Sequence, residues 1–322
     1  MRTSQPLVSI ITPCFNAAPF LEETWESIRR QTYSKWEWVV ADDGSTDGSL
    51  EVLHGIGARD PRVRVIAMPG AAGQGAAAAR NCAAEAAKGS FLAFQDADDL
   101  WRPEKLEKQV KHLEQHPKVA AVCSWYSVFG DQMRCAVWSQ MLWRYATEVV
   151  TVDQILNQVP ATPTVLMRRD FYQQLGGMRV SPQLRAGEDK EFFLRLVLQH
   201  PMHRLCEELT EVRLHAPGRS LSTINLHQSE VRERAIIEGV KEAGLVNREL
   251  EKKLLAQLYY TLAKDALFHH GGPFRRNLLR SIKTFHAPPK AWLMASLAFL
   301  PRPALKRVLF LLLAARNPRT PS

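Results

Sequence analysis

The stretch SFLAFQDADDLWRPEKL, from Ser90 to Leu106, places three aspartates directly after an apolar run. The run has the composition of a buried strand, and Asp96, Asp98 and Asp99 follow where that strand ends. Carboxylates held this close repel one another, so something positive must lie beside them. Mg²⁺ and Mn²⁺ prefer carboxylate oxygens, and Mg²⁺ takes one or two of them plus substrate phosphates. The D-x-D spacing therefore suggests a metal–diphosphate site.

The same aspartates have a second interpretation as helix caps. Aspartate is a good N-cap, and the segment RPEKLEKQVKHLEQH that follows has the composition of a solvated helix. Capping alone would suffice for Asp99. It does not explain Asp96 and Asp98, which fall at the end of the strand.

Apolar runs and helical segments alternate before this stretch. The expected strands are LVSIIT (7–12, ended by Pro13), the start of WEWVVADDGSTDGS, VRVIAMPG and SFLAFQD. The expected helices are APFLEETWESIRRQ, SLEVLHGIGARD and GAAAARNCAAEAAKG, the last with its stop at Gly89. This order predicts a parallel α/β sheet with helices on both faces, and ligands bind at the carboxyl ends of such strands. Two of the four expected strands end in acidic residues, Asp42-Asp43 and Asp96–Asp99.

Composition narrows the class of protein. The chain has 322 residues, 46% of them hydrophobic, which is enough for a large core and excludes global disorder. Its five cysteines are scattered and form no CxxC pair, which predicts reduced thiols in the cytoplasm, no zinc site and no disulfide framework. The N-terminal apolar run is too short for a secretory signal. The longest apolar runs fall short of the ~20 residues that span a bilayer.

The net charge of +9 is concentrated near the C-terminus. No Asp or Glu follows residue 265, whereas ten Lys and Arg residues do. Prolines divide this stretch into short segments that each pair a basic edge with an apolar body. Two interpretations stay open: a helical cap packed on the protein, or peripheral attachment to an anionic membrane surface on the inner leaflet. The helical segment before it could pack on itself, on the rest of the chain or on a second copy, as in a homodimer.

Two histidines in the helix after the aspartates have metal-ligand spacing. His112 and His116 lie four residues apart in HLEQH. The HExxH pattern is missing and the segment is rich in lysine. We therefore expect a solvated helix and no metal site at this point.

Four stretches occur in one order and spacing that resembles glycosyltransferase family 2. They are VSIITPCFNAAPFLEETWESIRRQTYSKWEWVVADDGSTDGS, AARNCAAEAAKGSFLAFQDADDLWRPEKL, GEDKEFFLRL and VRLHAPGRSLS. The resemblance covers roughly residues 5–222. It implies an inverting, nucleotide-sugar-dependent enzyme of the GT-A fold, which is Rossmann-like with a mainly parallel sheet flanked by helices. The implied domains are a catalytic domain, 1–224, with a donor half to about 105 and an acceptor half over 106–224, and a helical, basic region, 225–322.

The resemblance also implies roles in donor binding. The loop after the first strand would line the nucleobase pocket with Thr12, Pro13, Phe15 and Asn16. Asp43 matches the base-binding carboxylate of the family. A carboxylate can accept a pyrimidine ring N–H, which favours a UDP-sugar. For the neighbouring Asp42 and Asp47, turn chemistry is the alternative.

The metal and diphosphate residues follow from the same motifs. Asp96 would face the ribose or sugar, and Asp98 would bind Mn²⁺ or Mg²⁺ with Asp96 beside it. His215 occupies the place of a family histidine near the diphosphate or metal, although a lone histidine is usually structural. Arg80 could reach the donor or form an ion pair on the helix surface, and Arg219 is a further diphosphate candidate.

Asp189 in GEDKEFF matches the general base of the family, with Glu188 as its partner. The alternative for both is the acidic first turn of the helix EDKEFFLRLVLQ. The implied reaction is a single displacement that inverts the anomeric centre. It moves a sugar from a nucleoside diphosphate to a hydroxyl of a glycan or lipid-linked acceptor, as in cell-surface polysaccharide synthesis.

Two other functions stay open. VRVIAMPGAAGQGAAAARN places Gly73-x-Gly75 between a strand and a helix, as in dinucleotide-dependent oxidoreductases, but residues 69–72 intervene after the strand. The basic tail could belong to a non-catalytic binding module. Its long aliphatic runs suit lipid better than nucleic acid, so we expect no nucleic-acid partner.

Overall fold

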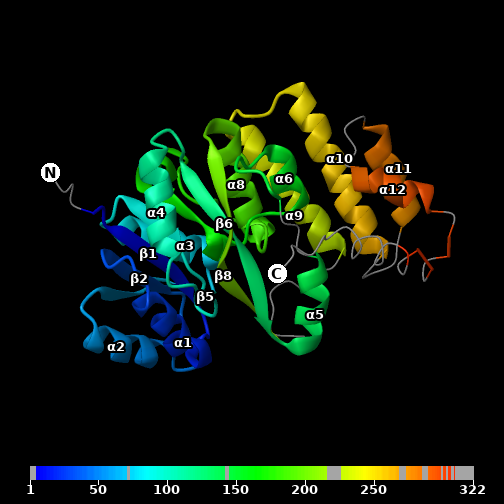
Figure 1. Cartoon of the computed structure of the whole chain (residues 1–322). Coiled ribbons are helices and arrows are strands. Elements are labelled where there is room, and N and C mark those ends of the chain that lie inside the picture. The colour runs from blue at the N-terminus through cyan, green and yellow to red at the C-terminus, as the bar shows by residue number, and fades with distance from the viewer. Residues whose placement is uncertain are drawn as a thin grey trace. The chain divides into compact units, whose positions relative to one another are not determined.

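The computed structural model describes residues 5–70, 73–141, 145–215, 226–267, 273–284, 289–298, 300–301, 304–305 and 308 (Figure 1). Contacts divide the chain into two compact units. Unit 1 comprises residues 1–135, 144–180 and 192–214, and unit 2 comprises residues 136–143, 181–191 and 215–322. The predicted boundary at residue 224 stays a prediction.

Unit 1 is built on an eight-stranded sheet of order β3-β2-β1-β4-β7-β6-β8-β5. The strands are β1 (Val8–Cys14), β2 (Trp36–Asp42), β3 (Val63–Ala67), β4 (Phe91–Phe94), β5 (Leu100–Trp101), β6 (Ala121–Gly130), β7 (Leu166–Arg168) and β8 (Met202–Leu214). The first four strands are parallel, as predicted. β7 runs antiparallel to β4 and β6, and β5 runs antiparallel to β8, so the whole sheet is mixed.

β1 does not end at Pro13, and that prediction was wrong. The strand continues to Cys14, with Pro13 paired in register to Ala41 of β2. On the other side of β1, pairing with β4 ends at Ile11 and Phe94. Alternate residues of a strand direct their backbone polar groups to the same side, so Pro13, like Ile11, faces β4. Because β4 has already ended at that point, the missing N–H of Pro13 costs no hydrogen bond in the sheet.

Helices connect and flank these strands. They are α1 (Ala18–Arg29), α2 (Ser49–Arg59), α3 (Ala76–Ala86), α4 (Lys105–Gln115), α6 (Val152–Asn157), α7 (Arg169–Gln174) and the 3-10 turn Thr162–Thr164. Two others, α5 (Gln132–Met141) and α8 (Glu188–Gln199), have residues in both units. The three helices predicted between the first four strands are confirmed.

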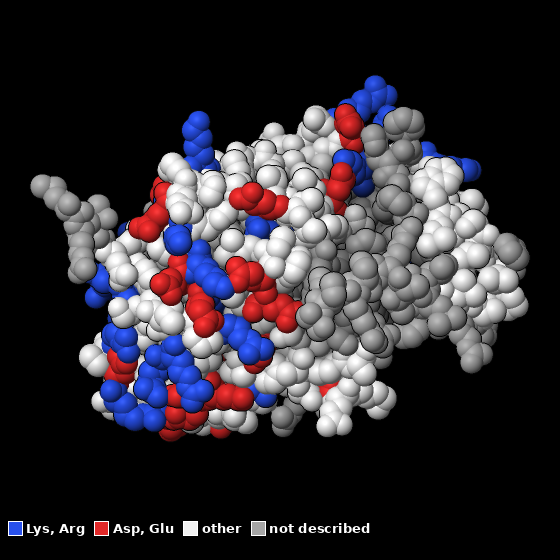
Figure 2. Space-filling model, in the orientation of Figure 1, with Lys and Arg blue, Asp and Glu red and all other residues white. Residues whose placement is uncertain are grey.

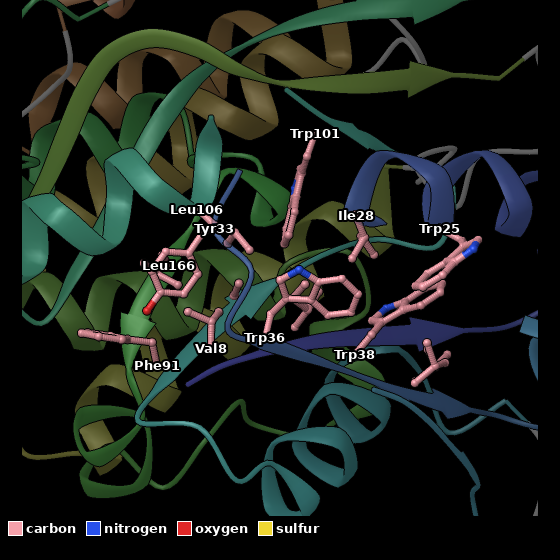
Figure 3. Packing of buried hydrophobic residues seen from close by; sticks show 14 of the residues in the cluster. Val8, Trp25, Ile28, Tyr33, Trp36, Trp38, Phe91, Trp101, Leu106 and Leu166 are labelled. Atoms are coloured by element: carbon pink, nitrogen blue, oxygen red, sulfur yellow. The ribbon is translucent and has the colours of Figure 1, made fainter. Parts of the chain in front are cut away.

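Tryptophans fill the core between α1 and the first strands (Figure 3). Trp25 of α1 stacks on Trp38 of β2 with ring centroids 5.8 Å apart, and it meets Trp36 edge-on at 6.0 Å. Every residue of β2 is buried, as in parallel strands that are covered on both faces.

Unit 2 contains the helical region predicted after residue 225. Its helices are α9 (Leu226–Glu242), α10 (Arg248–Asp265), α11 (Phe274–Lys283) and α12 (Pro289–Ser296), with a 3-10 turn at Pro182–Leu184. The Nζ of Lys190, in the first turn of α8, lies 2.8 Å from a carboxylate oxygen of Glu233 on α9, and both side chains are buried. This ion pair joins α9 to the residues around the GED motif.

The surface charges of unit 1 are mixed. Basic and acidic side chains lie next to one another over the region drawn blue and cyan in Figure 1, so the face in Figure 2 carries no broad area of one sign there. Among the described residues, no helix combines the length and apolarity that crossing a bilayer requires.

Gly89 has a different role from the helix stop that was predicted. α3 ends at Ala86, and Gly89 lies three residues further on. A Cβ atom at Gly89 would lie 2.5 Å from the carbonyl oxygen of Leu7 and 2.7 Å from the backbone N of Ser9. Glycine is therefore required because the chain entering β4 passes directly against β1.

We expect Gly89→Ala to lower the free energy of unfolding by about 1–3 kcal/mol, because backbone atoms must move apart. Gly55→Ala is the matched control, since Gly55 is exposed on α2 and a Cβ atom there would meet nothing within 4 Å. The control should raise the free energy of unfolding by about 0.5–1 kcal/mol. Urea denaturation at 25 °C measures both, and changes of the same sign would contradict this account.

Candidate active site

The aspartates of the opening stretch lie in the loop between β4 and β5. Asp96 and Asp98 are half-buried, whereas Asp99 is buried. Thr24 Oγ1 donates to the carbonyl oxygen of Asp99 at 3.2 Å, and Gln95 Nε2 donates to the same oxygen at 2.6 Å. The backbone that carries the carboxylates is thus held from both α1 and the end of β4.

Arg80 of α3 supplies one compensating charge. Its Nη2 lies 2.6 Å from Asp96 Oδ1, and its side chain is only 6% exposed. The sequence left open a donor contact or an ion pair on the helix surface. An ion pair is observed, but it is buried beside the acidic loop, so its expected place on the surface was wrong. Whether Arg80 also contacts a donor stays a prediction.

Arg213 of β8 supplies a second charge, and the sequence analysis missed it. Its backbone N donates to Asp99 Oδ1 at 2.7 Å, and its Nε donates to the carbonyl oxygen of Asp98 at 2.9 Å. The guanidinium also pairs with Glu23 of α1. The only signal was an arginine two residues before the motif histidine. Its orientation depends on the pairing of β8 with β5, which sequence spacing does not reveal.

Asp99 does not cap the following helix, and that interpretation was wrong. The N-cap of α4 is Glu104. Burial, followed by the charges of Asp98 and Asp96, raises the pKa of Asp99 well above its usual range. A further cation beside the cluster would offset this repulsion and stabilise the ionised carboxylates.

The residues predicted to line the nucleobase pocket differ in exposure. Thr12 is fully buried, and its Oγ1 accepts a hydrogen bond from Trp38 Nε1 at 2.8 Å, so it contributes no accessible surface here. Pro13 is half-buried, and Phe15 is 52% exposed. Of these, Phe15 offers the largest apolar surface to a ligand.

Asn16 shapes the turn after β1. Its φ of 52° is in the left-handed region, which asparagine adopts more readily than most residues. Its Oδ1 accepts from Thr46 N at 2.8 Å, and its own N donates to Ser45 Oγ at 2.9 Å. These hydrogen bonds join the loop after β1 to the loop after β2.

Two acids of the second motif serve turn chemistry, as the alternative interpretation held. Asp42 Oδ2 accepts from the backbone N–H groups of Gly44 and Ser45, at 3.1 and 3.0 Å. Asp47 Oδ1 accepts from the N–H of Ser49 at 3.1 Å. These hydrogen bonds close the turn that leads into α2.

Asp43 is buried and engages the glycine turn before α3. Its Oδ1 accepts from Gln74 N at 2.9 Å, its Oδ2 from Gly75 N at 2.7 Å, and its backbone oxygen from Gly73 N at 3.0 Å. In a dinucleotide site these N–H groups would face a pyrophosphate. Here the carboxylate and the backbone oxygen of Asp43 occupy them, which removes the basis of the oxidoreductase alternative.

Glu188 and Asp189 lie in unit 2, in the first turn of α8, as the alternative interpretation of this helix predicted. Both are half-buried. Glu188 Oε2 accepts from Gly187 N at 3.0 Å, and Asp189 Oδ1 accepts from Lys190 N at 2.7 Å. Their roles as base and partner stay predictions.

The loop before α8 is tightly supported by α9. A Cβ on Gly187 would lie 2.6 Å from Arg232 Cδ, and a Cβ on Gly239 would lie 2.7 Å from the buried Glu191 Oε1. Ala186, at a φ of 56°, turns the chain into the helix. The position of the GED motif is therefore supported by close contacts at two glycines, where a larger residue would displace the side chain of Arg232 or Glu191.

His215 and Arg219 complete the predicted set. His215 is half-buried and lies in unit 2, directly after β8. Arg219 lies outside the described residues. A metal or diphosphate role for either residue stays a prediction.

Comparison with known sequences identifies relatives. TuaG of Bacillus subtilis, whose name describes a glycosyltransferase of teichuronic acid biosynthesis, is 33% identical over 217 residues, which are 66% of this chain and 81% of the relative. The UDP-Glc:alpha-D-GlcNAc-diphosphoundecaprenol beta-1,3-glucosyltransferase WfgD of Escherichia coli is 42% identical over 108 residues, 33% of this chain and 41% of the relative.

Solved structures share the fold. TarS of S. aureus, crystallised with UDP-GlcNAc, superposes with a TM-score of 0.67 at 18% identity, covering 94% of this chain and 87% of TarS. The mannosyltransferase PcManGT of Pyrobaculum calidifontis, in complex with GDP-Man and Mn²⁺, gives 0.58 at 20% identity, covering 97% and 87%. These similarities show the GT-A fold, with its helical C-terminal region.

A family model described as glycosyl transferase family 2 matches residues 9–176, the segment that holds the acidic loop, Arg80 and the Asp43 turn. This match spans more than half of the chain and includes two of the four motifs. The chain belongs to glycosyl transferase family 2.

Proposed function

We propose that this glycosyltransferase moves a sugar, with inversion, from a nucleoside diphosphate to a hydroxyl of a surface polysaccharide or lipid-linked acceptor, using a divalent cation. The observation that carries the proposal is the acidic loop after β4, where three carboxylates are crowded beside Arg80 and Arg213. The relatives' names, which mention teichuronic acid and a diphosphoundecaprenol acceptor, support this acceptor class.

The donor set of the acidic loop fits Mn²⁺ or Mg²⁺. Asp98 is the first ligand, because it is half-buried at the tip of the loop. Asp96 can add an oxygen, since its contact with Arg80 uses Oδ1. His215 is the third candidate ligand. The cation would neutralise charge that builds on the departing diphosphate, an effect worth several kcal/mol. The Mn²⁺ in the structure of PcManGT supports this assignment.

The chain's own residues supply the remaining steps. Asp43 fixes the loop beside the base pocket and can accept a pyrimidine N–H, which favours a UDP-sugar. The UDP-GlcNAc bound to TarS supports that donor class. Asp189 removes the proton of the acceptor hydroxyl, and Glu188 assists it. General-base catalysis of this kind contributes roughly 10²–10⁴-fold.

For α11 we propose a peripheral membrane attachment of a different form from the one that its basic edge and apolar body suggested. α11 does pair a basic edge with an apolar face, but Phe274 and Leu278 are buried with α10, and Ser281 Oγ donates to Ala256 O of that helix at 2.8 Å. The apolar face is therefore occupied by packing. Its exposed face carries basic residues, so we propose an electrostatic contact with an anionic membrane. The exposed basic residues of α11 are Arg275, Arg276, Arg280 and Lys283.

We expect Asp98→Ala to abolish transfer and to weaken nucleoside-diphosphate binding in the presence of Mn²⁺, because the cation loses its first carboxylate. Asp170→Ala is the control, since Asp170 is an exposed acid on α7. Transfer assays and calorimetric titration with UDP, each with Mn²⁺ or excess EDTA, measure both effects. Full transfer by the wild-type protein in EDTA would refute metal dependence.

We expect Asp189→Asn to retain UDP binding while turnover falls by roughly 10²-fold or more, because the amide cannot take the proton. Asp170→Asn is matched, since Asp170 is also an acid in a first helical turn whose Oδ1 accepts from the next backbone N–H. Donor affinity and turnover are measured separately. Turnover within about tenfold of wild type would rule out Asp189 as the base.

We expect replacement of Arg275, Arg276 and Arg280 by Gln to reduce binding to anionic vesicles at least tenfold, because each basic residue near such a surface contributes about 1 kcal/mol. The matched control replaces Lys35, Lys111 and Lys118, which are exposed elsewhere. Flotation of the full chain at low and high salt is the measurement. Equal flotation of both triple variants would refute a role for α11.

A further inference from the structure

The histidines of HLEQH are joined by a third from a distant strand. His203 lies at the start of β8, and a ligand nitrogen from each of His112, His116 and His203 lies within 4.8 Å of the other two. The sequence argument against a metal site considered two histidines on a solvated helix. It could not see His203, which is 91 residues from His112 in the chain and 3.0 Å from it in space.

A carboxylate completes the group. Glu148 Oε1 lies 3.2 Å from His203 Nδ1 and 3.8 Å from His112 Nε2, and those two nitrogens are 3.0 Å apart. A triangle with these sides has a circumscribed radius of about 2.0 Å, which matches zinc–nitrogen and zinc–oxygen bond lengths. One ion can therefore touch all three atoms with little movement of the side chains, once the proton shared between the two nitrogens has moved to the other nitrogen of its ring.

His116 is already oriented as metal-bound histidines usually are. Its Nδ1 lies 2.8 Å from the carbonyl oxygen of His112. A carbonyl only accepts, so this Nδ1 carries the proton and Nε2 keeps its lone pair. A ligating histidine commonly donates its second N–H to a backbone carbonyl, which fixes the tautomer.

The backbone around the group is held by pairing. Val149 forms an isolated antiparallel bridge with His203, and Arg204 N donates to Glu148 O at 2.6 Å. Side-chain exposure is 11% for His112 and 14% for His203, but 55% for Glu148. The imidazoles are thus sheltered, and the carboxylate marks an open path for an ion.

We propose that His112, His116, His203 and Glu148 form a binding site for a transition-metal ion of the zinc class. Imidazole nitrogens suit Zn²⁺, Ni²⁺ and Cu²⁺, whereas Mg²⁺ prefers an all-oxygen set. Three nitrogens and one oxygen match four-coordinate zinc in protein sites. The bound ion would tie the C-terminal end of α4, the segment before α6 and the start of β8 together.

Protonation does not stand in the way of this site. Burial is the main cause that lowers the pKa of both His112 and His203, and the Glu148 carboxylate acts in the opposite direction. A lower pKa favours the neutral imidazole, which is the form that binds a metal ion.

The site is separate from the acidic loop. His203 pairs with Val122 of β6 and Arg213 with Phe129, seven residues further on, and a strand rises about 3.3 Å per residue, which places the two ends roughly 20 Å apart. The ion bound by the histidines would therefore stabilise the fold and take no part in sugar transfer.

The test is binding of Zn²⁺ alone to the full chain without an affinity tag, in excess Mg²⁺ to occupy the acidic loop. We expect one Zn²⁺ per chain, a thermal midpoint that rises with Zn²⁺ concentration, and a tetrahedral absorption band with Co²⁺. His203→Gln and Glu148→Gln should each weaken Zn²⁺ binding about tenfold or more.

Two controls keep the result interpretable. His54→Gln removes an exposed histidine of α2 and should leave Zn²⁺ affinity unchanged. If His203→Gln fails to fold, as judged by circular dichroism in EDTA, His116→Gln at the helix C-terminus takes its place. Zn²⁺ affinity of the cluster variants equal to that of wild type, or no binding by the wild-type chain, would overturn the proposal.

Discussion

The structure of unit 1 depends on how three crowded carboxylates are tolerated at the end of β4. Asp99 is buried, and its neighbours raise its pKa because they add charge where water cannot screen it. Two arginines offset the repulsion between the carboxylates. Arg80 of α3 pairs with Asp96, and Arg213 of β8 contacts the Asp99 side chain and the Asp98 backbone. Helix, sheet and loop are thereby coupled through the charges of the acidic loop.

Much of the donor half follows from sequence pattern, because its contacts are local. The strands and helices from Val8 to Phe94 alternate in short units. Each short apolar run in this segment forms one strand of the sheet, so the pattern can be recognised from the sequence. The antiparallel strands β5 and β7 were not predicted. They are two and three residues long, too short to carry a period, and their partners lie far along the chain. The sequence did not predict the roles of Arg213 and His203 for the same reason. Both lie on β8, and their contacts depend on which strands pair with β8.

Motifs were informative only together with their surroundings. The glycine turn before α3 has the spacing of a dinucleotide fingerprint, yet its three N–H groups serve Asp43. HLEQH has the spacing of a metal motif, but it lacks the HExxH pattern, and the sequence therefore predicted no metal site. The third histidine of the proposed site, His203, comes from β8, which lies far along the chain. In both cases the deciding fact is which group lies opposite the motif, and this is a property of the fold.

The close contacts of Gly187 and Gly239 bear on how the protein is made. A ribosome releases residues 181–191 well before α9, which begins at Leu226. Until α9 has emerged, Lys190 lacks the carboxylate of Glu233 and the backbone at Gly187 lacks the helix against which it packs. The nascent chain therefore cannot set the GED loop in its final form until α9 has been synthesised.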